Sequence, residues 1–170
     1  MSADQHGSRW LRLAKRVVFF PLVLLLLPIV ASFLLCLAVR NATFLVCLWI
    51  AWRARGLDTL IVYSNSPNWQ DYFEGAVIPA IGRRGAVLNW SERKRWPTLS
   101  WSTLAFRFFA GEKEFNPIVV ILRPWRQPQT YRFHNALRDA KHGKLQRLRE
   151  VTGKLSDDLS VEVPMTSVGA

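Results

Sequence analysis

The sequence predicts an α/β protein, with an N-terminal transmembrane helix followed by a small three-layer domain around a short, mostly parallel sheet. Two observations lead to this fold class. The run Val17–Val39 is apolar and carries no charge, and as a helix it extends roughly 34 Å, enough to cross a hydrocarbon core of about 30 Å. From Leu57 onward, short apolar runs alternate with helical segments in the order βαβαβα, which is typical of a parallel sheet with crossover helices.

The residues 1–16 form a basic flank before the apolar run. Four basic residues surround Trp10 there, and tryptophan beside arginine is typical of the membrane interface. The apolar run is longer than the core of a cleaved signal peptide, and no small residue stands before Cys36 or Cys47 as a lipoprotein signal requires. We therefore expect the helix 17–39 to remain in the mature protein and to cross the membrane once.

The segment 40–55 contains a second apolar patch, Phe44–Trp52, which is too short to cross a bilayer as a helix. Three arrangements fit it. We favour an interfacial segment with its tryptophans at head-group depth. The alternatives are a helical extension towards the domain and a second membrane limb that turns at Arg40-Asn41.

The charge of the chain is strongly positive. It has 23 Lys and Arg against 12 Asp and Glu, a formal net charge of +11, and most of this excess lies beyond the apolar segments. Such a surface attracts phosphate groups of anionic lipids or of nucleic acids. Because the chain also carries an anchor, we expect a bilayer with anionic head groups as the partner and consider nucleic acid unlikely.

The side of the membrane is weakly determined. The flanks of the apolar run carry nearly equal numbers of basic residues, so the positive-inside rule does not choose between the two orientations. The positive domain favours the cytoplasmic face, where anionic lipid would attract it.

The residues 56–155 are predicted to form the domain. Three runs, Thr59–Tyr63, Gly85–Trp90 and Pro117–Arg123, indicate strands because they are short, apolar and bounded by turn residues. A sheet of three strands has two edges that need covering, which favours a homo-oligomer or a membrane protein partner.

Helices are expected between and after these strands. The first is predicted over Pro67–Ile81, with Ser66 as its N-cap and Gly82 at its end. The second is predicted over Leu99–Ala110. Helical residues return from about Phe133 to Leu155, and the residues 156–170 are expected to be a flexible tail.

In sheets of this kind, ligands bind beyond the carboxyl ends of the strands. The rule selects eight candidate ligand-binding residues in the loops after the three strands: Ser64, Asn65, Ser66, Asn89, Ser91, Glu92, Arg93 and Arg123. A hydroxyl-rich loop that opens a helix suits a phosphate, but this one lacks the glycines of a dinucleotide-binding or P-loop fingerprint. The structural alternative is that Ser66 caps its helix and the residues around Glu92 form a solvated turn.

No metal or cofactor site is expected. His134 and His142 stand eight residues apart on one predicted helix, roughly 12 Å along its axis, which is too far to share one metal ion. Both cysteines lie in the apolar segments. No hydrolase, kinase or zinc-protease motif is present, so no catalytic residue is assigned.

The predicted C-terminal helical region has a basic outer face around an apolar line. The basic residues are Arg132, Arg138, Lys141, Lys144, Arg147, Arg149 and Lys154, and the line consists of Leu137, Leu145, Leu148 and Leu155. A helix that packs on the sheet fits this pattern, and so does a helix that lies on an anionic membrane surface.

Two short runs resemble parts of the Toll/interleukin-receptor-type domain. They are Val62-Tyr63-Ser64 followed by Trp69, and Ser91-Glu92-Arg93. The resemblance covers less than half of the domain, and the later elements and the catalytic glutamate of that family have no clear match. We do not assign the chain to the family.

Two hypotheses follow for function. The first is a membrane-anchored, non-enzymatic module that binds or organises partners at the membrane surface. The alternative is an enzyme or sensor that binds a phosphorylated, nucleotide-like ligand at the carboxyl ends of the strands.

Overall fold

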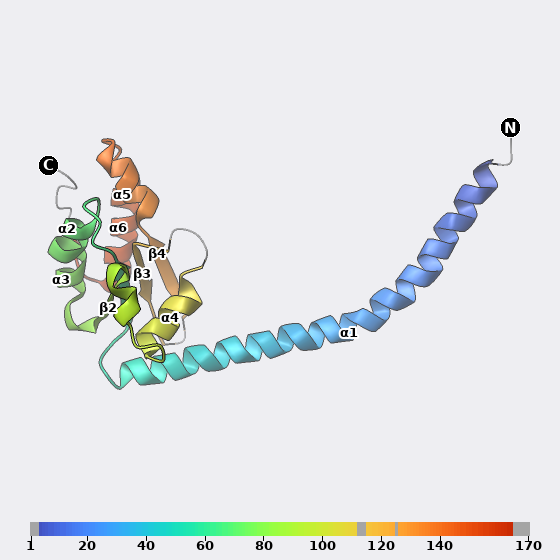
Figure 1. Cartoon of the computed structure of the whole chain (residues 1–170), viewed down its shortest axis with the longest axis horizontal. Coiled ribbons are helices and arrows are strands. Elements are labelled where there is room, and N and C mark those ends of the chain that lie inside the picture. Colours follow the sequence, from blue (N-terminus) through green and yellow to red (C-terminus); the bar gives the residue numbers. More distant parts are fainter. Residues whose placement is uncertain (1–3, 112–114, 125, 165–170) are drawn as a thin grey trace. The chain divides into compact units, whose positions relative to one another are not determined.

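The computed structural model describes residues 4–111, 115–124 and 126–164, with side chains from Leu24 onward (Figure 1). It consists of two compact units, Met1–Val46 and Cys47–Ala170. The first unit is helical, and the second contains the sheet and the helices packed on it. The protein is therefore α/β with a long N-terminal apolar helix.

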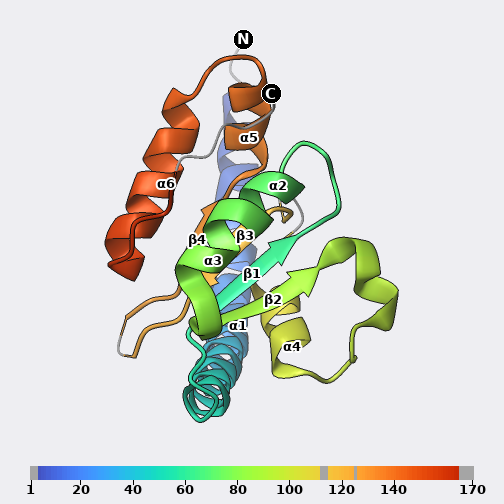
Figure 2. The same ribbon diagram turned by 90° about the vertical axis from the view of Figure 1, so that its left-hand side faces the viewer.

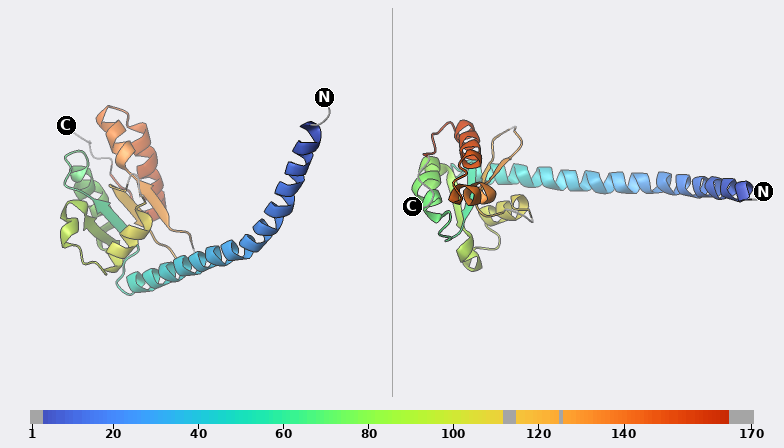
Figure 3. Two further views of the ribbon diagram at one scale, coloured as in Figure 1. Left: turned by 45° about the vertical axis from the view of Figure 1, so that its right-hand side comes forward. Right: turned by 90° about the horizontal axis from the view of Figure 1, so that it is seen from above.

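The helix α1 (Asp4–Arg53) is continuous (Figure 3). Within the described part, its segment Leu24–Arg53 is long and apolar enough to cross a membrane. A stretch of 18 residues within it has a mean hydropathy of 2.1 and no buried residue. Because the helix runs through Arg40-Asn41 without a turn, the second-limb alternative is wrong. The residues 40–53 extend the helix, and their placement in the membrane interface stays a prediction.

The last two turns of α1 belong to the second unit. There the side chains of Leu48 and Trp52 are only 0% and 1% exposed. Cys47 and Ile50, at other positions around the helix, are exposed. The end of this helix therefore has one side packed in the domain and an apolar side that the domain leaves uncovered.

The sheet has four strands in the order β2-β1-β3-β4 (Figure 2). The strands are β1 (Thr59–Tyr63), β2 (Gly85–Asn89), β3 (Ile118–Ile121) and β4 (Gln129–Arg132). Thr59 pairs with Gly85 in parallel β2 and with Ile121 in antiparallel β3. β3 and β4 are also antiparallel.

The predicted mostly parallel sheet and the order βαβαβα are therefore corrected. Gln129–Arg132, for which no strand was predicted, forms a fourth strand, and its short connection from β3 requires antiparallel pairing. The direction of β3 follows from where α4 (Trp101–Phe109) ends. The Arg132 guanidinium donates to the carbonyls of Phe109 and Ala110 at 3.3 and 2.8 Å, so the chain begins β3 near the end of β4 and the carboxyl end of β1.

The helical segment after β1 confirms the predicted first helix in most of its length. It consists of α2 (Gln70–Tyr72), the π-helical turn η1 (Phe73–Val77) and α3 (Ile78–Ile81). Gly82 ends it with φ of 61°, a conformation that glycine adopts at little cost. The 3₁₀ turns η2 (Gly82–Arg84) and η3 (Trp90–Arg95) precede and follow β2.

Two helices form the C-terminal region, α5 (His134–Lys141) and α6 (Gln146–Leu159). Leu137, Leu148 and Leu155 are buried in the core, so their apolar line is not free to enter a membrane. We expected a flexible tail from residue 156, whereas α6 continues to Leu159 and Val163 is buried. The residues 165–170 of that tail lie outside the described residues.

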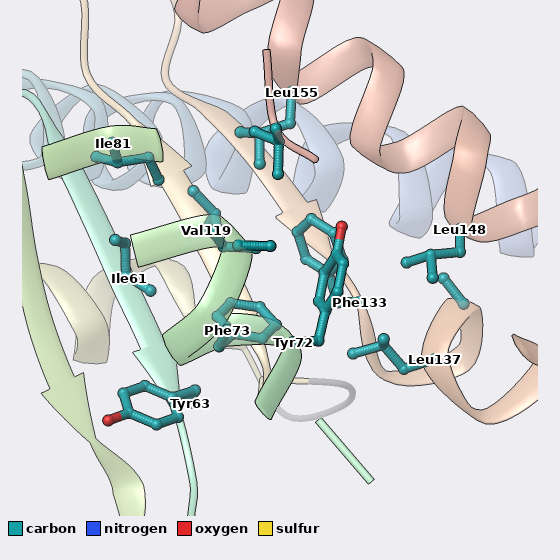
Figure 4. Packing of buried hydrophobic residues seen from close by; sticks show 14 of the residues in the cluster. Ile61, Tyr63, Tyr72, Phe73, Ile81, Val119, Phe133, Leu137, Leu148 and Leu155 are labelled. Atoms are coloured by element: carbon teal, nitrogen blue, oxygen red, sulfur yellow. The ribbon is translucent and has the colours of Figure 1, made fainter. Parts of the chain in front are cut away.

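The main core covers one face of the sheet (Figure 4). Ile61 and Val119 of the central strands belong to this core. Within it, the rings of Phe73 and Phe133 meet edge to face with centroids 5.3 Å apart. On the alternate face, Leu60 and Val120 are also fully buried. Both faces of β1 and β3 are covered, which explains their continuous apolar sequences.

A buried hydrogen bond of 2.8 Å joins the hydroxyls of Tyr72 in α2 and Thr152 in α6. We expect Tyr72→Phe to lower the free energy of unfolding by about 1–3 kcal/mol, because the Thr152 hydroxyl is left buried without its partner. The measurement is thermal or denaturant unfolding of the full chain in detergent micelles.

The control is the double variant Tyr72→Phe/Thr152→Val, which removes both polar groups. Its stability should recover towards that of the unsubstituted protein. A double variant that loses the sum of the two single effects would contradict the pairing.

Candidate functional site

The carboxyl ends of β1 and β2 bring most of the sequence-predicted site residues together. Val62 and Tyr63 pair in register with Leu88 and Asn89, so the loops that follow the two strands start side by side (Figure 2). The arrangement of this carboxyl edge decides whether its side chains are free to bind a ligand.

Ser64 is buried, with 8% of its surface exposed. Its hydroxyl oxygen accepts hydrogen bonds from Trp69 Nε1 at 3.0 Å and from Asn116 Nδ2 at 2.9 Å. The hydroxyl therefore fixes the loop after β1 to the first helical turn and to the entry of β3. A nucleophilic serine needs a base that accepts its proton, and these two contacts are donors to it.

Asn65, Asn89 and Ser91 tie the two loops to each other. Asn65 N donates to Ser91 Oγ at 3.0 Å, and Asn89 Nδ2 donates to Asn65 Oδ1. Asn89 Oδ1 in turn accepts from Ser91 N at 3.0 Å and so caps η3. Three of the predicted ligand side chains thus satisfy one another.

Ser66 precedes the turn that leads into α2, whose own N-cap is Trp69, three residues later than the sequence predicts. Gln70 N donates to the Ser66 carbonyl at 2.9 Å, and Asn68 N lies 3.4 Å from the Ser66 hydroxyl. This arrangement supplies an acceptor for a backbone amide in that turn, as an N-cap does.

An acidic group that the sequence reasoning missed lies at the same edge. The Tyr63 hydroxyl donates to Glu74 Oε1 at 2.9 Å, and Gln70 Nε2 donates to the same oxygen at 3.1 Å. The pKa of Tyr63 is raised from 10.0 to about 12. Burial of the hydroxyl is the largest cause, the hydrogen bond to Glu74 and the charge of Glu74 come next, and the charge of Glu92 adds to the shift. The tyrosine therefore stays protonated at neutral pH. Its spacing of eleven residues from Glu74 follows from the fold and has no local sequence signal.

Glu92 and Arg93 lie on the exposed turn η3. The Arg93 guanidinium stacks over the Trp90 ring, 4.9 Å from its centroid. Trp90 packs with three further aromatic residues, Trp96, Phe106 and Phe115, and Trp96 Nε1 donates to the carbonyl of Asn89 at 3.0 Å. The cation is thus held against an aromatic cluster that supports the turn.

Arg123 does not lie at this edge. Because β3 is antiparallel to β1, Ile121 pairs with Thr59 at the start of β1, and Arg123 follows at the opposite edge of the sheet. There it forms an ion pair with Asp158 at 3.5 Å. Placing Arg123 with the other seven residues was wrong, since the sequence does not reveal the direction of β3.

Asn116 takes the place that we had assigned to Arg123. It directly precedes Pro117 and β3, and its Oδ1 is buried without a hydrogen-bond partner among the described residues. The Nδ1 atom of His134 is also buried without a hydrogen-bond partner among the described residues. The centroid of the His134 ring lies 5.7 Å from that of the Trp69 ring. Sequence reasoning missed Asn116 because it precedes a strand, whereas the rule selects residues that follow one.

No family model, no curated protein and no solved structure matches the chain. The resemblance of two short runs to the Toll/interleukin-receptor-type domain gains no support from these comparisons. The function has to be inferred from the chemistry of the chain itself.

The carboxyl edge has little unused binding capacity. Its hydroxyl and amide groups are largely paired with one another, and its exposed charges are of both signs, with Glu74 and Glu92 near Arg93, Lys94 and Arg95 of η3. Among the described residues, no group of three potential ligand side chains is arranged to hold a metal ion. The arrangement therefore stabilises the two loops.

The three serines give a graded test of this interpretation. Ser64→Ala should lower the free energy of unfolding most, by about 1–3 kcal/mol, because two donors lose their acceptor. Ser66→Ala should cost about 1 kcal/mol as a lost cap. Unfolding midpoints of the full chain in micelles measure both changes.

Ser91→Ala is the matched control. Its hydroxyl accepts from the exposed amide of Asn65, which water can satisfy instead, so the loss should stay within about 0.5 kcal/mol. Equal stability of the Ser64 and Ser91 variants would show that Ser64 is not a structural acceptor.

Proposed function

We propose that the protein is a membrane-anchored module of non-enzymatic, binding or organising type, whose small basic domain is held at an anionic bilayer surface. The observation that carries the proposal is the end of α1. Leu48 and Trp52 are buried in the domain, so the last turns of α1 are part of the domain and follow the candidate membrane segment directly in the chain.

The uncovered side of the same helix end supports this interpretation. Ile50 is 55% exposed, and Cys47 beside it is exposed as well. Apolar side chains at the end of a membrane helix are stable in contact with lipid. The interfacial placement of the segment 40–55 accounts for this uncovered apolar side.

The charge of the domain supports an anionic surface as the partner. Basic residues attract phosphate head groups, at about 1 kcal/mol for each cation near the membrane. The anionic cytoplasmic leaflet is the surface to which we assign the domain. A second copy of the chain or another membrane protein is a further partner in this proposal, since β2 and β4 are edge strands of the sheet.

The enzyme or sensor alternative receives less support. Most of the polar groups at the carboxyl edge already bind one another, which leaves few hydrogen-bond donors for a phosphorylated ligand. A binding module requires no activated nucleophile or base at this edge.

The anchor is tested with Leu25→Arg. Leu25 lies within the apolar run and is 66% exposed, and an arginine at the centre of a membrane helix costs about 2.5–3.5 kcal/mol on insertion scales. The unsubstituted protein should remain with membranes after carbonate extraction, and the variant should be released in part.

Leu99→Arg is the matched control. Leu99 is 83% exposed in the domain, so the same substitution there should leave membrane retention unchanged. Release of the unsubstituted protein by high salt alone would show that α1 is not an integral anchor.

A further inference from the structure

Three chain segments bring arginines to the amino edge of the sheet, where β1 and β2 begin. The segment between α1 and β1, the turn η2 before β2 and the loop after β3 all lie there. We call these residues the amino-edge arginines: Arg53, Arg55, Arg83, Arg84, Arg123 and Arg126.

Backbone hydrogen bonds place the three segments side by side. Asp58 N donates to the carbonyl of Arg84 at 3.1 Å, and Leu122 N donates to the carbonyl of Asp58 at 2.8 Å. Gly85 and Ile121 flank Thr59 in the sheet. Arginines that are far apart in the sequence therefore share one edge of the domain.

Two carboxylates neutralise only part of this charge. Asp58 binds Arg84 at 2.5 Å and Asp158 binds Arg123 at 3.5 Å. Arg53, Arg55, Arg83 and Arg126 are exposed, and within the described ranges no ion pair to a carboxylate is found for these four. The edge thus keeps a net positive charge that is open to a phosphate ligand.

The anchor enters the domain at this same edge. Leu57 N donates to the carbonyl of Trp52 at 2.9 Å, and Gly56 N donates to the carbonyl of Arg53 at 3.1 Å. The amino-edge arginines therefore surround the chain where it leaves the apolar helix. Guanidinium groups suit phosphate oxygens because their planar donors match them in pairs.

We propose that the amino-edge arginines bind the phosphate groups of anionic phospholipids. The domain then rests with the amino edge of β1 against the bilayer and with the carboxyl edge towards water. This inference rests on the proposed function, since it assumes that α1 is a membrane anchor, and it adds which surface touches the lipid.

A second basic surface lies at the opposite end of the domain. The turn between α5 and α6 is drawn at the top of Figure 2, away from the start of β1, and Lys141 beside it donates to Asn68 in the loop after β1 at 2.9 Å. Its cations include Arg138, Lys144 and Arg149, which are exposed. They provide a control surface of the same charge.

The experiment compares two triple variants of the full chain, reconstituted in phosphatidylcholine bilayers that contain a small share of nitroxide-labelled lipid. The first is Arg53→Gln/Arg55→Gln/Arg83→Gln, and the second is Arg138→Gln/Lys144→Gln/Arg149→Gln. Tryptophan quenching by labelled phosphatidylglycerol is compared with quenching by labelled phosphatidylcholine. All six positions are exposed, and no ion pair to another described residue holds them, so neither variant should shift the unfolding midpoint.

The unsubstituted protein should prefer phosphatidylglycerol, and the preference should fall as salt rises. In the first variant it should fall by roughly fivefold for each arginine removed, the factor expected for one cation near the surface. The second variant should keep the preference of the unsubstituted protein.

The outcomes separate the two proposals. A preference that persists in the first variant, or that is lost only in the second, would overturn the amino-edge site and leave the anchored module standing. Absence of any preference in the unsubstituted protein would overturn the proposed function together with this site.

Discussion

The burial of Leu48 and Trp52 is the constraint on which the account of this protein depends. Because these side chains of α1 are enclosed by the domain, the apolar helix and the sheet are joined through packed turns. Only the short segment from Ala54 to Asp58 separates α1 from β1, and its backbone is held by hydrogen bonds to Trp52 and Arg84. The proposal of a lipid-binding amino edge rests on this connection, because the chain passes from the end of α1 into β1 at that edge.

The direction of β3 determines what each edge of the sheet contains. With β3 antiparallel, the loop after it joins Arg83 and Arg84 at the amino edge, and Asn116 joins Ser64 at the carboxyl edge. The two edges therefore differ in chemistry. The carboxyl edge combines paired hydroxyl and amide groups with charges of both signs, while the amino edge holds arginines in excess over Asp58 and Asp158. An edge with unpaired cations attracts anionic surfaces more strongly than an edge whose polar groups are hydrogen-bonded to one another.

Local patterns in the sequence predict much of the fold. Side-chain type and spacing predict the strands Thr59–Tyr63 and Gly85–Asn89 and the end of the first helix at Gly82. The direction of β3 and the existence of β4 were missed, because both depend on where α4 ends relative to the sheet, a tertiary feature. For the same reason Ser64 looks like a free ligand side chain in the sequence, although Trp69 and Asn116 both donate to it. The contacts at this edge join residues that are far apart in the sequence, and the spacing of apolar residues along the chain does not reveal them.

The orientation of the domain on the bilayer tests the central claim most directly. Nitroxide labels at Arg83→Cys and Lys144→Cys, in a full chain whose Cys36 and Cys47 are replaced by alanine, would report the amino edge and the opposite end separately. Relaxation by nickel-chelating lipid head groups in phosphatidylglycerol bilayers measures how near each label lies to the surface. We predict strong relaxation of the label at position 83 and weak relaxation at position 144. Equal relaxation of the two labels, or the reverse order, would contradict the account.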